Sequence, residues 1–386
     1  IGEPPLMACR FILKALSARP QLLAARLRSK SNVHSNSTEV PDPSGSPSFD
    51  TFPVVNFPVD KEESTEQGLL IPRIDLSHVG CASALGRLES NEDRLLACEL
   101  SPFLRFFGIF DGHGGPQAAD FALAVMPECV RYRLAELTNV YRKRGLSLRS
   151  IHPKYLEQVL ENAFLEVNNL MSRHFLYYTT AHIRQSTGTT ATVVLMRHSY
   201  QLVIGHVGDS RALICRKGRI EPLTVNHDPS TLVRLSDLIK GDEGDGITES
   251  DRIVASGGHV TTSSLGVPVV NGRLGMTRSL GDLPLKAFGV SAHPQLLSLK
   301  VRHSHDSFLV IVSDGVTHVM SDEEIFNIVA SSKTPKEAAK SLVEDALLYG
   351  SDDNASALVI PFGSWGRYPG LDEKTIDPTR IAFRSY

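Results

Sequence analysis

Hydrophobic residues recur along the chain at two kinds of spacing, and each kind predicts a different element. Short, nearly continuous apolar runs predict buried strands, and they occupy residues 106–110, 189–196, 200–208, 210–218 and 307–315. Apolar residues three and four positions apart predict helices over 117–137 and 155–175, each shortly after a proline, and over 336–348. Two helices, a series of short strands and a further helix predict an α/β (α+β) fold in which helices cover sheets. Strands and helices do not alternate regularly and no GxxxxGK[ST] motif occurs, so a Rossmann or P-loop fold is disfavoured.

The same pattern predicts where the folded domain begins and ends. Residues 39–68 contain five prolines and a charged end, which is typical of a linker. The globular domain is expected over 69–365, followed by a C-terminal tail over 366–386. Residues 1–38 mix Leu, Ile, Ala and Ser with six basic residues and one acid, the composition of a mitochondrial targeting segment. Pro20 weakens the helix that such a segment needs, and the alternative is an ordinary amphipathic helix packed on the domain.

Charge and cysteine content make several classes of function unlikely for this chain. The net charge is −3, but residues 1–38 carry +5, so the remaining chain carries −8 and is a poor partner for nucleic acid. No apolar run of about 18 residues predicts a transmembrane helix, so membrane insertion is not expected. The five cysteines are scattered without a CxxC pair. This pattern favours a reducing compartment, consistent with the mitochondrial matrix, over a disulfide framework or a zinc site.

Acidic residues recur where the apolar runs stop. A single aspartate at a strand end usually caps a turn, but several near glycines indicate a cluster, and buried carboxylates repel one another unless cations neutralise them. Oxygen ligands without paired His or Cys select Mg²⁺ or Mn²⁺, and two such ions sharing a carboxylate form a phosphoryl-transfer site. The residues concerned are Glu92, Asp93, Asp111, Asp209, Asp282, Asp314, Asp352 and Asp353.

The segment IFDGHGGP, residues 109–116, shows how such a site begins. A buried strand ends in Asp111, which is placed to bind both ions, and Gly112 leaves room for its own carbonyl to bind one of them. His113 stands beside this site as a candidate proton donor. The alternative for His113 is a histidine that merely satisfies a turn.

In these and further motifs the chain resembles the PPM family of metal-dependent Ser/Thr protein phosphatases, the type 2C class. The motifs NEDR, FDGHGG, VGDSRA, NGRLGMTRSLGD, VSDGVTHVM and GSDDNASALVI occur in the family's order between about residues 80 and 360. The resemblance implies a central β-sandwich of two antiparallel sheets with helices on both outer faces. It also implies two Mg²⁺ or Mn²⁺ ions, with a weaker third.

The resemblance further implies a role for individual residues. Asp314 and Asp353 would bind the second metal, Glu92 a metal directly or through water, and Asp209 the weaker third ion. A water activated by the two ions would attack phosphorus in one step, and His113 would protonate the departing serine or threonine oxygen. Asp93 and Asp282 are expected to support the site, although a purely structural role explains them equally well. The implied metal ligands are Glu92, Asp111, Gly112, Asp209, Asp314 and Asp353.

The implied substrate is a mitochondrial matrix phosphoprotein such as the branched-chain 2-oxoacid dehydrogenase complex. Three departures from the family's pattern bear on activity. Leu88 occupies the usual position of a phosphate-binding arginine, which leaves Arg87 as the candidate for that role. His318 stands where many members carry an aspartate, which weakens the case for the third metal. The segment after Pro229 is longer than expected.

Two rival hypotheses remain. Cys81 and Arg87 have the spacing of a thiolate phosphatase, but no cation precedes Cys81 and the loop lacks a glycine-rich phosphate cradle. A pseudophosphatase that binds phosphoproteins without turnover is favoured by Leu88. The intact set of Asp111, Asp314 and Asp353 opposes it.

Overall fold

The computed structural model describes residues 59–60, 71–143, 152–233, 247–264 and 266–368. The predicted targeting segment 1–38, most of the predicted linker, the segment 234–246 and nearly all of the predicted tail lie outside these residues. Within the predicted linker, β1 (Val59–Asp60) pairs in antiparallel fashion with β2 (Ile71–Pro72).

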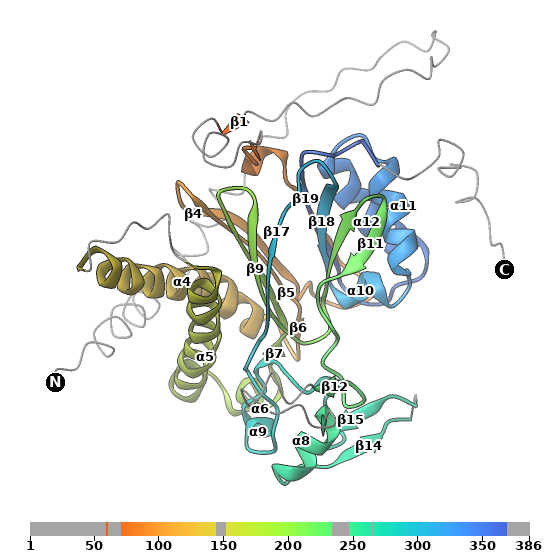
Figure 1. The fold of residues 1–386 in the computed structure, drawn as a ribbon. Helices are drawn as coiled ribbons and strands as arrows, with labels where there is room; N and C mark the ends of the chain where they lie inside the picture. The colour runs from red at the N-terminus through yellow and green to blue at the C-terminus, as the bar shows by residue number, and fades with distance from the viewer. Residues whose placement is uncertain (1–58, 61–70, 144–151, 234–246, 265, 369–386) are drawn as a thin grey trace. The chain divides into compact units, whose positions relative to one another are not determined.

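Two five-stranded antiparallel sheets form the centre of the domain (Figure 1). The first sheet has the order β11 (Arg219–Pro222), β10 (Arg211–Arg216), β18 (Asp306–Val312), β19 (Ala355–Pro361) and β3 (Gly80–Ala84). The second has the order β17 (Gln295–Lys300), β9 (Gln201–Val207), β8 (Ala191–Arg197), β5 (Leu104–Phe110) and β4 (Arg94–Ser101). Every predicted strand is therefore present, and the predicted fold class is confirmed.

The main core lies between the two sheets. Side chains alternate along a strand, so Leu309 and Ile311 of β18 pack with Phe107 of β5 in this core. Phe308 and Val310 point to the opposite face, where they pack against helices. Because the central strands are buried on both faces, they are apolar at almost every position rather than at every second one.

Helices cover both outer faces of the sandwich (Figure 1). The helices α4 (Gln117–Lys143) and α5 (Pro153–Tyr178) pack on the second sheet, and α11 (Asp322–Ser331) and α12 (Pro335–Leu348) pack on the first. A capping box starts α11, because the Ser321 side chain accepts from the Glu324 amide while the Glu324 carboxylate accepts from the Ser321 amide. Within the described residues, no helix is both long and apolar enough to span a membrane.

Antiparallel pairing brings distant parts of the chain to one end of the sandwich. There β5 and β18 end, while β10 and β19 begin. Short elements surround this end: β6 (Gly112–His113), β7 (Gly188–Thr189), β16 (Leu280–Gly281), α6 (Ala181–Ser186), α9 (Leu283–Lys286) and α10 (Asp314–Thr317). Beyond them lie α8 (Glu249–Ala255), β12 (Leu232–Val233), β13 (Ile247–Thr248), β14 (Val260–Thr262) and β15 (Pro268–Val270). The remaining element is the 3-10 helix η1 (Leu76–His78).

Candidate metal centre

Three carboxylates from separate strand ends meet at this end of the sandwich. Asp111 follows β5, Asp209 precedes β10 and Asp314 follows β18. One oxygen from each lies within 4.8 Å of the other two. The strand topology thus brings together three of the six residues that the sequence predicted as metal ligands.

Hydrogen bonds to the neighbouring strands hold the turn that carries Asp111. Its amide donates to Thr190 Oγ1 at 3.1 Å, and its carbonyl accepts from the Thr190 amide at 2.8 Å and from Thr189 Oγ1 at 3.0 Å. At Gly112, a Cβ atom would lie 2.7 Å from the Glu92 carbonyl oxygen. Only glycine therefore fits at this position, which keeps the turn close against the chain at Glu92.

Burial and mutual repulsion raise the pKa values of all three carboxyl groups. Burial is the largest cause for Asp111, whose pKa lies well above its usual range, and the charges of Asp314 and Asp93 raise it further. Burial, with the charge of Asp314, raises the pKa of Asp209 to about 7. Burial also raises the pKa of Asp314. Three carboxylates cannot all be ionised here at low energetic cost without a compensating cation.

Several oxygens at this site are buried but have no hydrogen-bond partner among the residues that the structure describes. They are Oδ1 of Asp209, Oδ1 of Asp314 and both carboxylate oxygens of Asp93. Buried polar atoms are normally satisfied, so a group of unpartnered carboxylate oxygens is suited to bind a cation. An all-oxygen donor set of this kind fits a hard divalent cation such as Mg²⁺ or Mn²⁺.

Glu92 and Asp353 lie beside the three-carboxylate cluster rather than within it. Glu92 Oε2 accepts from the Gly115 amide at 2.9 Å, and the Glu92 amide donates to Asn354 Oδ1 at 2.7 Å. The charge of Asp353 raises the pKa values of both Asp93 and Asp314, which places it next to them. Both side chains therefore border the cluster.

His113 forms an ion pair with Asp282. Its Nε2 lies 2.9 Å and 3.0 Å from the two carboxylate oxygens, and Ser279 Oγ donates to Asp282 Oδ2 at 2.6 Å. Burial lowers the pKa of His113, but the Asp282 charge outweighs this effect and the net change is upward. A Cβ at Gly188 would lie 2.1 Å from Asp282 Oδ2 and 2.4 Å from His113 Nε2, so glycine makes room for the pair.

The partner of His113 was not predicted from the sequence. Asp282 was interpreted only as a supporting or structural residue, and the two are 169 positions apart. The only signal in the sequence was weak, an aspartate directly after a glycine in RSLGD. In the structure the Asp282 backbone is left-handed, with φ of 47°, which is unusual for a residue other than glycine.

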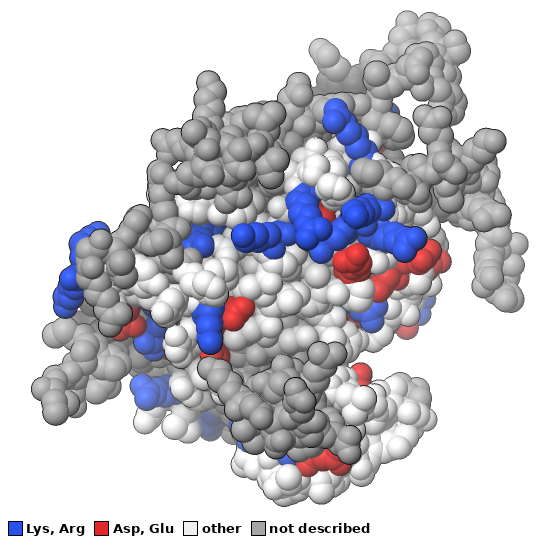
Figure 2. All heavy atoms as spheres, in the orientation of Figure 1, with Lys and Arg blue, Asp and Glu red and all other residues white. Residues whose placement is uncertain are grey.

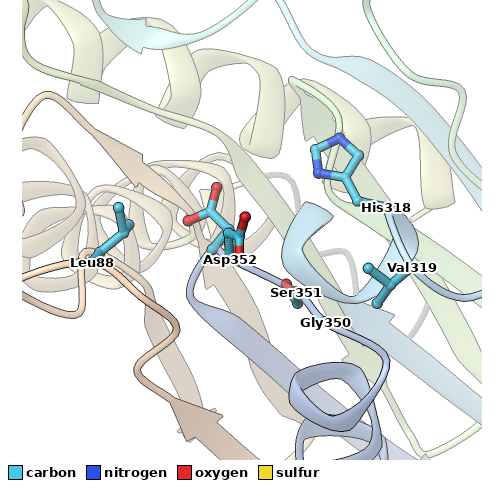
Figure 3. A pocket seen from close by; sticks show the side chains of 7 residues that line it. Leu88, His318, Val319, Gly350, Ser351 and Asp352 are labelled. Atoms are coloured by element: carbon cyan, nitrogen blue, oxygen red, sulfur yellow. The ribbon is translucent and has the colours of Figure 1, made fainter. Parts of the chain in front are cut away.

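A cavity of about 380 Å³ opens beside Asp353 (Figure 3). Its lining includes Leu88 and Asp352 on one side and His318 and Val319 on the other. Arg87 is not among the lining residues; its Nη1 pairs with Asp352 Oδ1 at 2.9 Å, and its side chain is 78% exposed.

The remaining sequence candidates have simple environments. His318 Nδ1 lies 3.7 Å from Asp314 Oδ2 at the end of α10. Cys81 lies in β3, and desolvation raises the pKa of its thiol to about 11. A thiolate nucleophile requires the opposite change.

Comparison with known proteins gives concordant matches. Residues 78–355 match the family model described as protein phosphatase 2C. "Protein phosphatase 1K, mitochondrial" of Xenopus laevis is 40% identical over 85% of this chain and 80% of its own length. "Probable protein phosphatase 2C 59" of Arabidopsis thaliana is 32% identical over 74% of this chain and 79% of its own. The crystal structure of serine-threonine phosphatase 2C from Toxoplasma gondii shares the fold, with a TM-score of 0.59 and 22% identity over 74% of this chain and 94% of that one.

Proposed function

The chain belongs to the protein phosphatase 2C family of Ser/Thr phosphatases, and from that premise we propose that it dephosphorylates a mitochondrial matrix phosphoprotein using Mg²⁺ or Mn²⁺. The observation that supports this most strongly is the cluster of Asp111, Asp209 and Asp314, with its unpartnered buried oxygens. These half-buried carboxylates repel one another unless a cation binds, so the cluster opposes a pseudophosphatase that has lost its ions.

The residues proposed to hold the ions are the three clustered aspartates, with Asp353, Glu92 and the Gly112 carbonyl beside them. Bound there, Mg²⁺ or Mn²⁺ would activate a water for attack on phosphorus and offset charge on the phosphoryl oxygens. The Thr189 and Thr190 hydrogen bonds to the Asp111 backbone hold the turn that carries this carboxylate.

His113 is the proposed proton donor to the departing serine or threonine oxygen. An alkoxide leaves poorly without a proton, and a histidine that pairs with a carboxylate carries one near neutral pH. Asp282 holds the imidazole by its Nε2 edge and stabilises the protonated form. The pairing leaves Nδ1 as the ring nitrogen available to a substrate.

The leaving group provides the test of this role. His113→Gln should lower kcat on a phosphoserine peptide by about 10²- to 10⁴-fold, the usual contribution of a general acid. On p-nitrophenyl phosphate, whose leaving group needs no proton, the same variant should lose far less activity. Equal losses on both substrates would contradict proton donation and indicate a structural role. Asp282→Asn should show the same preference for p-nitrophenyl phosphate, in a weaker form.

Arg87 is proposed to contact the phosphoryl group only weakly, in place of an arginine at position 88. Its guanidinium is exposed and already near the site, since it pairs with Asp352 and the Arg87 amide donates to the Asp352 carbonyl at 2.9 Å. Binding phosphate would require the side chain to leave or extend beyond this pair.

Localisation and substrate complete the proposal. We propose that residues 1–38 direct import, that 39–68 form a linker to a phosphatase domain over 69–365, and that 366–386 form a tail. The proposal rests on the basic, acid-poor composition of the first segment and on the similarity to a relative named as mitochondrial. A fluorescent reporter fused to residues 1–40 should accumulate in mitochondria, and a diffuse cytosolic signal would contradict the targeting role.

The proposed substrate is the phosphorylated branched-chain 2-oxoacid dehydrogenase complex. This follows from the resemblance found in the sequence. Phosphate release from that complex should have a higher kcat/KM than release from phosphorylated casein. Equal values would remove the complex as the preferred substrate while leaving the phosphatase activity intact.

A further inference from the structure

Exposed basic residues gather at the end of the sandwich opposite the metal centre. Lys217 and Arg219 lie in and after the turn between β10 and β11, and Lys300 and Arg302 lie where β17 leads into β18. The two turns are adjacent, because the Lys217 amide donates to the His305 carbonyl at 2.8 Å. Figure 2 shows several Lys and Arg side chains next to one another on one face, with Asp and Glu side chains along one edge of the group. We call Lys217, Arg219, Lys300 and Arg302 the basic cluster.

The basic cluster is separate from the catalytic site. The strand β18 starts at this end with Asp306 and finishes next to Asp314 at the other. At about 3.3 Å per residue, its seven residues separate the two ends by about 20 Å. A small phosphopeptide in the site would not reach the basic cluster, whereas a folded phosphoprotein is large enough to contact both.

Carboxylates lie near the basic cluster, but the nearest ones belong to other pairs. Asp306 is buried and pairs with Arg216 at 2.8 Å, and Glu221 lies 3.8 Å from the same arginine. Among the described residues, no carboxylate forms an ion pair with a member of the basic cluster. The concentration of positive charge stands out on a chain whose net charge is −3.

The chemistry of the surface favours an acidic protein over a membrane. Surfaces that bind anionic lipid combine cations with exposed apolar side chains that enter the bilayer. In the described parts of the two turns no large hydrophobic side chain is exposed, and the half-exposed Phe103 in the β4–β5 turn at the same end is a single apolar side chain. Salt-dependent docking to a carboxylate-rich protein surface needs only the charges.

We propose that the basic cluster docks an acidic surface of the phosphoprotein substrate, about 20 Å from the phosphorylated residue. This inference rests on the proposed phosphatase function. Docking at a second site raises the effective concentration of the phosphorylated segment at the first, so it lowers KM without changing kcat.

Three synthetic peptides test this geometry. The first carries phosphoserine alone, the second adds a two-residue linker and six glutamates, and the third adds a fourteen-residue Gly/Ser linker before the same glutamates. A flexible linker of fourteen residues spans about 20 Å on average, whereas two residues span about 8 Å. At low salt the long-linker peptide should have a KM at least about five-fold below that of the other two, with the same kcat. The difference should vanish at about 0.5 M NaCl.

A charge-reversed variant assigns the effect to the basic cluster. Lys217→Glu/Lys300→Glu/Arg302→Glu should abolish the advantage of the long linker and leave hydrolysis of the untailed peptide unchanged. The matched control reverses the exposed Arg142, Lys143 and Lys154, at the ends of α4 and α5, and should keep the advantage. Equal KM values for the three peptides on the wild-type protein would overturn the docking proposal alone, because hydrolysis of the untailed peptide reports the phosphatase activity separately.

A direct binding measurement covers the case in which no peptide is hydrolysed. The anisotropy of a fluorescein-labelled hexaglutamate peptide should rise with wild-type protein and with the control variant, but not with the charge-reversed variant. Sedimentation of the wild-type protein with vesicles of phosphatidylcholine and phosphatidylglycerol, without any response to hexaglutamate, would overturn the proposal in favour of a membrane surface.

Discussion

Replacing Asp209 with asparagine should stabilise the metal-free protein. Asp209 shares its site with Asp111 and Asp314, and burial raises its pKa to about 7 from a usual value of 3.8. The folded protein therefore disfavours the ionised form. Between pH 4 and 7 the folded state binds a proton that the unfolded state releases, so the stability of the metal-free protein falls as pH rises through this range. Asparagine cannot ionise, so the variant does not lose this stability as pH rises.

The expected size follows from that pKa. A difference of about three pH units corresponds to about 4 kcal/mol at most, since each unit contributes about 1.4 kcal/mol. Because neighbouring carboxylates share the repulsion, about 2–4 kcal/mol is the expected gain at pH 8. For a domain of this size, that gain raises Tm by about 4–8 °C. At pH 5 the gain should shrink to about 1–2 kcal/mol, because Asp209 is protonated in the folded state but still largely ionised in the unfolded state.

Differential scanning calorimetry in EDTA and in Mn²⁺ measures the stability of the metal-free and the metal-bound protein. In EDTA at pH 8, Asp209→Asn should melt above the wild type. In Mn²⁺ the wild type should gain more than the variant, because a bound ion stabilises only the folded state. Glu323→Gln, which removes one exposed charge from α11, is the control and should change neither value. A variant that melts below the wild type in EDTA, with an undiminished response to Mn²⁺, would refute the reasoning.

Four further substitutions test three separate parts of the molecule. Leu88→Arg should raise kcat/KM on a phosphoserine peptide by about 10- to 100-fold, since a charge-assisted bond to phosphate contributes about 1.5–3 kcal/mol. In the same assay Arg87→Ala should lower kcat/KM little if position 88 is the productive one. If Leu88→Arg left kcat/KM unchanged and Arg87→Ala lowered it strongly, Arg87 would already bind the phosphate. Cys81→Ser should keep kcat within about two-fold of the wild type, as expected for a thiol whose pKa is raised to about 11. An inactive variant, together with wild-type activity that resists chelators, would support a thiolate mechanism instead. Glu249→Gln should destabilise the fold at pH 7 by about 3–5 kcal/mol, because it leaves the guanidinium of Arg278, 2.6 Å from the buried carboxylate, without its partner. Burial raises the pKa of Glu249, but the charges of two arginines outweigh it and hold the pKa below its usual 4.5. The contribution of Glu249 to stability is therefore present above pH 4.5 and is lost as pH falls through the lower folded value. Equal melting temperatures of variant and wild type at pH 7 would contradict this account.

Much of the fold could be predicted because the strands are buried on both faces. The run at 307–315, for example, became β18 because both faces of that strand pack, against the second sheet and against helices. Helix ends were less predictable. The apolar periodicity stopped at residue 137 for α4 and 175 for α5, yet the helices continue to Lys143 and Tyr178 through polar or exposed residues that carry no periodic signal.

Site residues could be predicted from the sequence where they lie at the ends of long strands. They could not be predicted where two residues far apart in the sequence form a pair. The grouping of Asp111, Asp209 and Asp314 follows from carboxylates placed at the ends of antiparallel strands. The pair of His113 and Asp282 could not be read in the same way. It depends on the short β6–β7–β16 sheet, whose two-residue strands leave no recognisable pattern in the sequence.

Metal-dependent hydrolysis of a phosphoserine peptide tests the central claim most directly. Phosphate release should require Mn²⁺ or Mg²⁺, stop in EDTA and return when Mn²⁺ is added in excess. Asp111→Asn should abolish it, because this carboxylate is one of the three that form the cluster and Thr190 hydrogen bonds hold the turn that carries it. Activity that persists in EDTA, or an Asp111→Asn protein that keeps more than a few per cent of kcat in saturating Mn²⁺, would contradict the account.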